Sequence, residues 1–226
     1  MKSKNTTSTR FKYLDVISVL FVATLIISNI GSTKIIGIGP IVFDGGTILF
    51  PLAYILGDVL TEVYGFRKAR RVILMGLGVL LLSSIIFTII QYLPAASGLE
   101  DQAVAYERIA GFIPRIVGAS ILAYVIGEFV NAFILAKLKV KTAGKKFWLR
   151  SISSSAAGQL LDTIIFSVIA FWGTLPNKDL FTLIVTVYVL KIIFELLVLP
   201  ITYAVVGYLK RAEESDVYET EFSLLR

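Results

Sequence analysis

The chain has 226 residues, of which 56% are hydrophobic and only 17% charged, and it contains neither Cys nor His. A soluble domain carries about a quarter charged residues, so the composition favours a membrane protein over a soluble enzyme. The missing Cys and His exclude disulfides, iron–sulfur and histidine zinc sites, and Ser-His-Asp or Cys-His catalysis. We expect no cofactor and no metal, and any chemistry must use carboxylates, amides, hydroxyls, Lys or Arg.

Six windows are apolar and long enough to cross a hydrocarbon core, which takes about 20 helical residues. They cover approximately 13–36, 45–64, 72–93, 110–136, 152–174 and 181–209. The segments between them are short. The sequence therefore predicts an all-α, polytopic integral membrane protein whose six transmembrane helices form one domain, 1–226.

The basic residues predict an orientation. Seventeen of the 22 Lys and Arg fall in the N-terminal segment, the loops after the second and fourth spans, and the C-terminal tail. Because Lys and Arg concentrate in cytoplasmic loops, we expect both termini in the cytoplasm. The net charge of +6 then needs no nucleic-acid partner. The acidic tail from Glu213 to Glu221 is expected to be a solvated end.

Two halves of three spans each would lie in opposite orientations, as in inverted-repeat transporters. The second and fifth spans carry polar residues at similar spacing. They read Gly57-Asp58 with Thr61-Glu62, and Gly158-Gln159 with Asp162-Thr163. A 3+3 inverted repeat is therefore one option for the architecture.

Charged side chains inside the predicted spans are the candidates for function, because each costs about 2.5–3.5 kcal/mol at the centre of a membrane helix. They are Asp58, Glu62, Glu128, Asp162, Glu195, Lys34, Arg115 and Lys191. Four spans bring polar groups to similar depth near mid-membrane, namely Glu128, Asp162, Lys191, Glu195, Asn29, Asn131 and Gln159. This pattern is typical of a transporter's substrate site, and the alternative is that these groups only hold helices together.

Two pairs of these residues stand four apart and so share a helix face. Lys191 and Glu195 are expected to neutralise one another, and the following Pro200 predicts a kink. Asp58 and Glu62 carry like charges, so either one is protonated or a cation lies between them. Two roles stay open for this second pair: an acid–arginine cluster at the cytoplasmic helix end, or gating and proton coupling.

Small and polar residues follow the first span, including Gly39 and Pro40. We expect an unwound helix end or a loop that dips inward against protein or water. Lys34 in this region either takes part in gating or extends to the membrane surface. Pro51 is expected to mark where the regular helix of the second span begins.

A family resemblance is carried by residues 50–67, which read FPLAYILGDVLTEVYGFR, and by the Ala69-Arg70 that follows. This run closely resembles the signature of the queuosine precursor transporter family, also called the vitamin uptake transporter family. Further matches are Asn29, Lys34, Gly158-Gln159, Asp162-Thr163, Phe166, Lys191, Glu195 and Pro200, so the resemblance extends from about residue 13 to about 210. It implies an inner-membrane importer of 7-cyano-7-deazaguanine or its 7-aminomethyl relative, and not an enzyme.

The resemblance also implies how the site works. The base would be held at mid-membrane during alternating access, with a carboxylate accepting the donors of its guanine-like edge. Aromatic rings, Trp172 among them if it faces inward, would stack on the bicycle, and an excess of interior negative charge would favour the aminomethyl cation. The substrate-binding candidates are Asn29, Glu128, Asn131, Gln159, Asp162, Lys191 and Glu195; the gating or coupling candidates are Lys34, Asp58 and Glu62.

The expected partners are a 7-deazaguanine base and membrane lipid. Ser154 and Gly158 form a small-xxx-small step that suits a helix contact, within one chain or in a homodimer. Two other functions stay open: the substrate-binding subunit of an energy-coupled vitamin or nucleobase transporter, and a channel. An intramembrane enzyme is disfavoured, because the sequence has no nucleophile–base pair and no phosphate loop.

Overall fold

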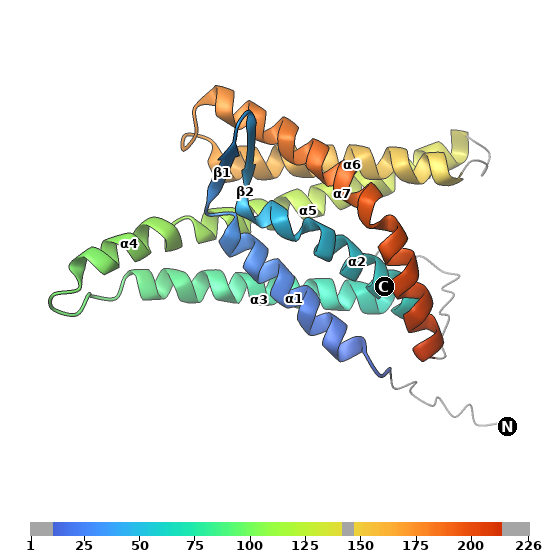
Figure 1. Ribbon diagram of the computed structural model, residues 1–226, viewed down its shortest axis with the longest axis horizontal. Coiled ribbons are helices and arrows are strands. Elements are labelled where there is room, and N and C mark those ends of the chain that lie inside the picture. The colour runs from blue at the N-terminus through green and yellow to red at the C-terminus, as the bar shows by residue number, and fades with distance from the viewer. Residues whose placement is uncertain (1–10, 142–146, 214–226) are drawn as a thin grey trace.

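The computed structural model describes residues 11–141 and 147–213. Within these residues, six helical segments are long and apolar enough to cross a membrane, and together they form an elongated bundle (Figure 1). They cover 14–31, 45–64, 66–91, 100–131, 153–171 and 177–212. The prediction of six membrane-spanning segments in a mostly helical protein is confirmed.

The elements follow one another with short connections. The first part of the chain contains α1 (Leu14–Gly31), β1 (Ile35–Ile38), β2 (Ile41–Asp44), the 3-10 helix η1 (Gly45–Leu49) and α2 (Phe50–Tyr64). The second part contains α3 (Phe66–Gln91), α4 (Glu100–Ala110), α5 (Ile113–Lys141), α6 (Phe147–Phe171) and α7 (Asn177–Ala212). Pro51 lies in the first turn of α2, as expected.

Two predicted loops are helical. The basic segment after the second span belongs to α3, which begins at Phe66 and not near 72, with Gly65 alone separating it from α2. Arg and Lys are good helix formers, so a basic segment at a membrane surface continues the helix. The segment before the fourth span contains α4, with Glu100 and Asp101 in its first turn and Arg108 in its last. Acidic residues at the start of a helix and basic residues at its end stabilise it by their interaction with the helix dipole.

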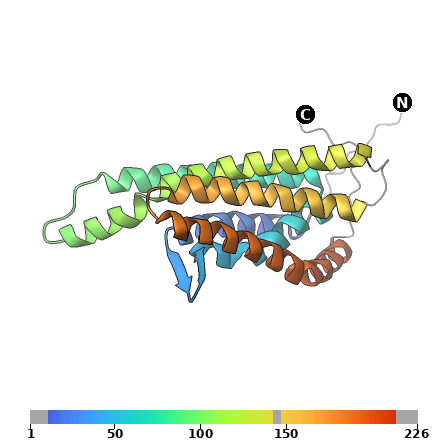
Figure 2. The same ribbon diagram turned by 90° about the horizontal axis from the view of Figure 1, so that it is seen from above.

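The all-α prediction missed a β-hairpin. The first helix ends at Gly31, and β1 and β2 pair antiparallel with Ile38 opposite Ile41. Gly39 has φ of 59° and, with Pro40, forms the turn between two runs of β-branched residues. Figure 2 shows this hairpin projecting from the helical bundle. The expected irregular segment is therefore a regular hairpin.

The hairpin leads into a tight junction between α1 and α2. Asp44 is 1% exposed and accepts hydrogen bonds from Ser32 Oγ at 2.6 Å, from the Gly46 amide at 3.0 Å and from Thr47 Oγ1 at 3.0 Å. Ser28 Oγ also donates to the Gly46 carbonyl at 3.2 Å. A buried carboxylate needs such donors, and here they lock the start of α2 to the end of α1.

The two ends of the bundle are packed differently. We name the end with the β-hairpin the hairpin end, and the end where Lys12 meets Glu213 the terminal end. The buried cluster at the terminal end comes from α1, α2, α3 and α7, and contains Ile17, Phe21, Leu56, Val59, Leu60, Val63, Tyr64, Ala69, Val72, Val206 and Leu209. The described side chains of α5 and α6 pack instead in two clusters at the hairpin end, with Ile116, Ala170, Leu183 and Val187 in one, and Leu80, Ile113 and Val117 in the other.

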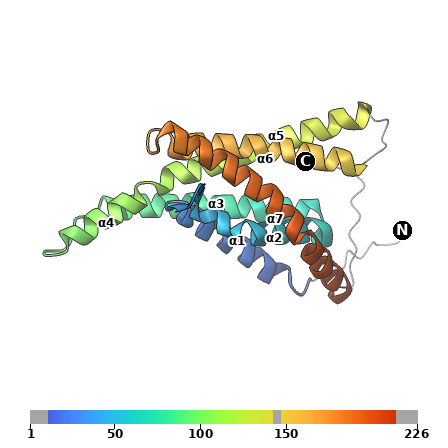
Figure 3. The ribbon, with the colours of Figure 1, turned by 45° about the horizontal axis from the view of Figure 1, so that its top comes forward.

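Helix α7 takes part in both kinds of packing. Leu180, Leu183 and Val187 lie in the hairpin-end cluster, whereas Val206 and Leu209 lie in the terminal-end cluster. Pro200 lies between them inside the continuous helix, and Figure 3 shows α7 changing direction in its C-terminal half. A proline inside a helix removes one hydrogen bond and causes such a bend.

Glu213 contacts the residues that precede α1, so the expectation of a solvated tail is wrong for this residue. Residues 214–221 lie outside the described part. Glu213 is 8% exposed and accepts hydrogen bonds from the Lys12 amide at 2.7 Å, the Tyr13 amide at 2.8 Å and the Tyr64 hydroxyl at 2.9 Å. The two amides belong to the start of α1, where helical N–H groups lack partners within the helix. Glu213 thus joins the ends of α1, α2 and α7.

Glu213→Gln tests this junction. Burial by itself raises the pKa of Glu213, but the donated hydrogen bonds and the Lys12 charge outweigh it and hold the pKa below its ordinary value of 4.5. Because the pKa of Glu213 is lower in the folded than in the unfolded protein, its ionised carboxylate stabilises the folded state above pH 4.5. This stabilisation is lost as the pH falls through the pKa of the folded state. The variant should lose about 1–3 kcal/mol at pH 7, measured by thermal unfolding with intrinsic fluorescence. The difference from wild type should shrink below pH 4.5, and a constant difference at all pH values would contradict this assignment.

Gly46→Ala tests the junction of α1 and α2. A Cβ at Gly46 would lie 2.3 Å from Ser32 Oγ and 2.4 Å from the Ser28 carbonyl oxygen, so the backbones must separate. We expect a loss of about 1–3 kcal/mol in thermal unfolding, as for overpacked cores. Gly78→Ala is the matched control, because nothing lies within 4 Å of a Cβ there. Equal stability of the two variants would refute the close packing.

Candidate functional site

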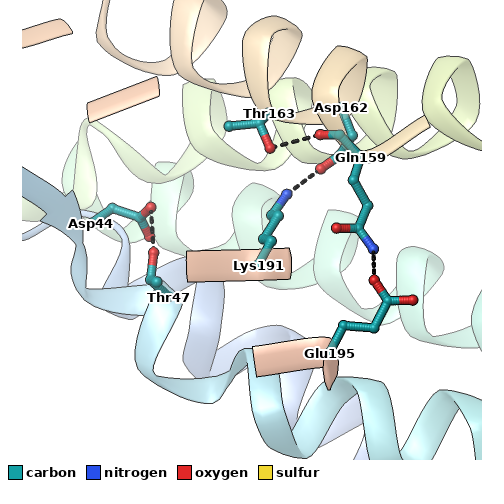
Figure 4. Close-up of polar contacts among 7 residues, drawn as sticks. All are labelled: Asp44, Thr47, Gln159, Asp162, Thr163, Lys191 and Glu195. Atoms are coloured by element: carbon teal, nitrogen blue, oxygen red, sulfur yellow. Dashed lines mark hydrogen bonds and ion pairs between the residues drawn. The ribbon is translucent and has the colours of Figure 1, made fainter. Parts of the chain in front are cut away.

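Four polar side chains on α6 and α7 form a central cluster, which we define as Gln159, Asp162, Lys191 and Glu195. Lys191 Nζ forms an ion pair with Asp162, and Gln159 Nε2 donates to Glu195 Oε2 at 2.7 Å (Figure 4). Residues three or four apart share a helix face. One face of α6 therefore meets one face of α7 in two adjacent contacts, Asp162 with Lys191 and Gln159 with Glu195. The expected neutralisation of Lys191 by Glu195 is therefore wrong. The partner of Lys191 comes from the neighbouring helix.

The ion pair is largely removed from solvent. The side chain of Lys191 is 10% exposed and that of Asp162 28% exposed. Burying a charge is costly unless a partner of opposite charge is in contact. Lys191 Nζ also lies 5.0 Å from the centre of the Phe50 ring, a distance at which the ring attracts a cation. The ammonium is thus held between a carboxylate of α6 and an aromatic ring of α2.

Helix α2 presents a row of side chains to this cluster. Phe50, Tyr54 and Asp58 are spaced by four residues and share a face. The rings of Phe50 and Tyr54 have centroids 6.2 Å apart, and both Tyr54 and Asp58 lie within electrostatic reach of Glu195. Sequence reasoning did not assign Phe50 or Tyr54 individually, although their spacing from Asp58 is a signal that could have found them.

Helix α5 approaches the cluster from the other side of α6. A Cβ at Gly127 would lie 3.0 Å from the Asp162 Cβ, and one at Gly158 would lie 2.8 Å from the Gly127 carbonyl oxygen. Small residues permit this close crossing of two membrane helices. Glu128, which follows Gly127, lies within electrostatic reach of Asp162, although its own side chain is exposed.

Two amide oxygens near this crossing have no hydrogen-bond partner among the described residues. They are Asn131 Oδ1 and Gln159 Oε1, both shielded from solvent. Buried polar atoms in native proteins are nearly always satisfied, and exceptions occur at functional sites where a ligand or water completes the bonding. The two unpaired oxygens could therefore accept hydrogen bonds from a ligand or from water.

Three candidates lie outside the cluster. The amide of Asn29 donates to the Leu25 carbonyl at 2.9 Å and accepts from Ser120 Oγ at 2.7 Å, which joins α1 to α5. Lys34 is exposed, and Glu62 lies 3.6 Å from Lys210. Glu62 is thus paired at the terminal end, whereas Asp58 lies within electrostatic reach of both Glu195 and Glu62.

Arg115, the remaining charged candidate of the spans, has structural contacts. Arg115 donates to the backbone carbonyls of Ile169 and Trp172, where the helical carbonyls at the end of α6 need donors. Trp172 itself is 60% exposed, so it does not face the cluster. Across residues 11–141 and 147–213, no group of three or more acidic residues is placed to bind a metal ion.

The fold and the site together define a class of protein. A bundle of membrane helices that holds paired charges and unsatisfied amides between its spans is the arrangement of a transporter. The family described as "Putative vitamin uptake transporter" matches residues 44–205. The chain belongs to this family, so the resemblance seen in the sequence is confirmed, as is the expectation of a transporter and not an enzyme.

Curated relatives agree with this assignment. A Bacillus subtilis (strain 168) protein named "Probable queuosine precursor transporter" is 29% identical over 173 residues, which cover 76% of this chain and 75% of the relative. The Escherichia coli (strain K12) "Queuosine precursor transporter" is 28% identical over 56% of this chain and 54% of its own length. A Haemophilus influenzae protein, also named "Probable queuosine precursor transporter", is 27% identical over 56% of this chain and 51% of its own length. No solved structure matches the chain.

Lys191→Met tests the ion pair. The substitution leaves Asp162 as a half-buried charge without its partner, which costs about 3–5 kcal/mol in other proteins. We expect a marked loss of thermal stability in detergent, and recovery of most of it when Asp162→Asn is added, because no charge is then left unpaired. Lys178→Met, at an exposed position near the start of α7, is the control. A Lys191→Met protein as stable as wild type would show that the pair contributes nothing.

Proposed function

We propose that this protein imports queuosine precursors, 7-deazaguanine bases, across the inner membrane, and that the central cluster holds the base. The observation that carries the proposal is the meeting of Gln159, Asp162, Lys191 and Glu195 between two membrane helices. Relatives named as queuosine precursor transporters support the choice of substrate. Lys and Arg placement supports cytoplasmic termini, so the terminal end would face the cytoplasm.

The chemistry of the cluster suits the edge of a guanine-like base. That edge presents adjacent N–H donors next to a carbonyl, and a carboxylate accepts two parallel donors well. Glu195 and Asp162 would supply the acceptors. Gln159 and Asn131 carry amides that complete the recognition, and their unpaired oxygens would gain donors when the base binds.

The charge balance around the cluster favours a cationic ligand. Asp58, Glu128, Asp162 and Glu195 lie on four helices in the region of one ammonium, that of Lys191. A ligand with a protonated aminomethyl group would reduce this negative excess, whereas a cyano group would not. We therefore propose that the 7-aminomethyl base binds more tightly than the 7-cyano base.

The packing of the bundle supports alternating access. At the hairpin end, α5 and α6 pack with the first half of α7, and at the terminal end, α1, α2 and α3 pack with its last turns. We propose that α5, α6 and the first part of α7 move against the other helices, with the bend at Pro200 as the hinge. Asp58, which lies within electrostatic reach of Glu195, is the candidate for proton coupling. The 3+3 inverted repeat stays a prediction.

Uptake by the purified chain in liposomes tests the proposal. Asp162→Asn and Glu195→Gln should each lower the initial rate of labelled 7-aminomethyl-7-deazaguanine uptake by at least about tenfold, because each removes a charged acceptor worth about 1.5–3 kcal/mol. Glu107→Gln, at an exposed position on α4, is the control and should transport normally.

The liposome experiment also separates the competing functions. Uptake by the chain alone would exclude a subunit that needs an energy-coupling partner. Saturation at micromolar substrate would distinguish a transporter from a channel. Normal uptake in both cluster variants would refute the assignment of the site, and no uptake by the wild-type chain would refute the transport proposal itself.

A further inference from the structure

We propose that Tyr54 of α2 and Tyr124 of α5 are specificity-determining residues of the central site, on whose rings a flat bicyclic ligand stacks. The inference rests on the proposed function for the identity of the base. It adds the two residues that would recognise the face of the ligand, whereas the carboxylates and amides of the cluster recognise its edge.

Tyr54 is placed beside the cluster by its neighbours. Its ring centre lies 6.2 Å from that of Phe50, and the Phe50 ring in turn lies 5.0 Å from Lys191 Nζ. Lys191 is paired with Asp162, so one short series of contacts leads from the Tyr54 ring to the ion pair. Phe50 also packs in the hairpin-end cluster, whereas Tyr54 belongs to none of the three hydrophobic clusters described above.

Tyr124 is placed beside the cluster by the close crossing of α5 and α6. It lies one turn before Gly127, where α5 comes nearest to the backbone and Cβ of Asp162. Tyr124 shares a face with Ser120 and Glu128, which are four residues away on either side. Both Tyr54 and Tyr124 lie within electrostatic reach of Asp162, so they approach the same carboxylate from different helices.

Neither phenol is committed to a structural bond. Tyr54 and Tyr124 are half-buried, their hydroxyls form no hydrogen bond with the residues that the structure describes, and neither hydroxyl oxygen is fully shielded from solvent. A tyrosine in a protein interior usually finds a partner for its hydroxyl. By contrast, the Tyr188 hydroxyl donates to the Ala156 carbonyl at 3.3 Å, and the Tyr64 hydroxyl to Glu213 at 2.9 Å. Two uncommitted phenols beside a charged cluster are suited to a ligand that has both a flat face and a polar edge.

The two rings come from the two packing units. Helix α2 packs against α1, α3 and α7, while α5 packs above all against α6. A ligand in contact with both rings would therefore bridge the units that alternating access moves apart. Stacking on an aromatic side chain is worth about 1–3 kcal/mol per base in proteins that bind single-stranded nucleic acids, which corresponds to about 5- to 150-fold in affinity.

The test compares two ligands that have the same hydrogen-bonding edge but differ in the area of the ring system available for stacking. 7-Aminomethyl-7-deazaguanine and 2,6-diamino-5-(2-aminoethyl)pyrimidin-4-one present the same donor edge and both carry an ammonium group, but the pyrimidine lacks the second ring. Binding of each to the purified full-length chain is measured calorimetrically for Tyr54→Leu and Tyr124→Leu, which remove the ring but keep an apolar side chain, and for Tyr54→Phe and Tyr124→Phe. Tyr203→Leu is the matched control, because Tyr203 is 72% exposed on α7.

We expect the Leu variants to bind the bicyclic base about 5- to 150-fold more weakly and to discriminate less between the two ligands, and the Phe variants to stay close to wild type. Asp162→Asn should instead weaken both ligands alike, because it acts on the shared edge. Leu variants that bind both ligands as wild type does, or that weaken both equally, would overturn this inference and leave the proposed function intact. A wild-type chain that binds neither ligand would overturn both.

Discussion

The charge of Lys191 inside a membrane helix is the constraint on which the rest of the site depends. An ammonium at that depth must meet a carboxylate, and Asp162 of α6 provides it. Once these two residues are in contact, the helical repeat brings Gln159 to Glu195, and the paired faces of α6 and α7 are aligned. Helix α2 adds the Phe50 ring, which lies beside the ammonium.

Helix α7 connects the site to the architecture of the bundle. Its first half packs with α5 and α6 and its last turns pack with α1, α2 and α3, so the charged residues lie between two hydrophobic regions. The junctions at Asp44 and Glu213 make α1, α2 and the end of α7 a coherent unit. A polar site between two such units is where a membrane protein can change shape without exposing its apolar core to water.

Much of the fold could be predicted because hydropathy reports directly on membrane burial. The six spans follow from mostly apolar stretches of about 20 residues, and Pro51 and Pro200 act locally on the helix that contains them. The β-hairpin was also readable, since Gly39-Pro40 lies between β-branched runs, but its position after an apolar span favoured a loop. Glu213 was misjudged because a short acidic tail resembles a solvated end, whereas its partners lie at the start of the chain.

For this protein, the sequence alone determined the class: six spans, the charged residues inside them, and the motif of residues 50–67 that identifies the family. These properties depend on composition and local spacing. Only the tertiary structure decided that Lys191 pairs with Asp162 and not with Glu195, that Asn29 serves a helix contact, and that Tyr54 lies beside the cluster. The reason is that these choices depend on which helix faces meet, and each helix can satisfy the same hydropathy pattern in several rotations about its axis.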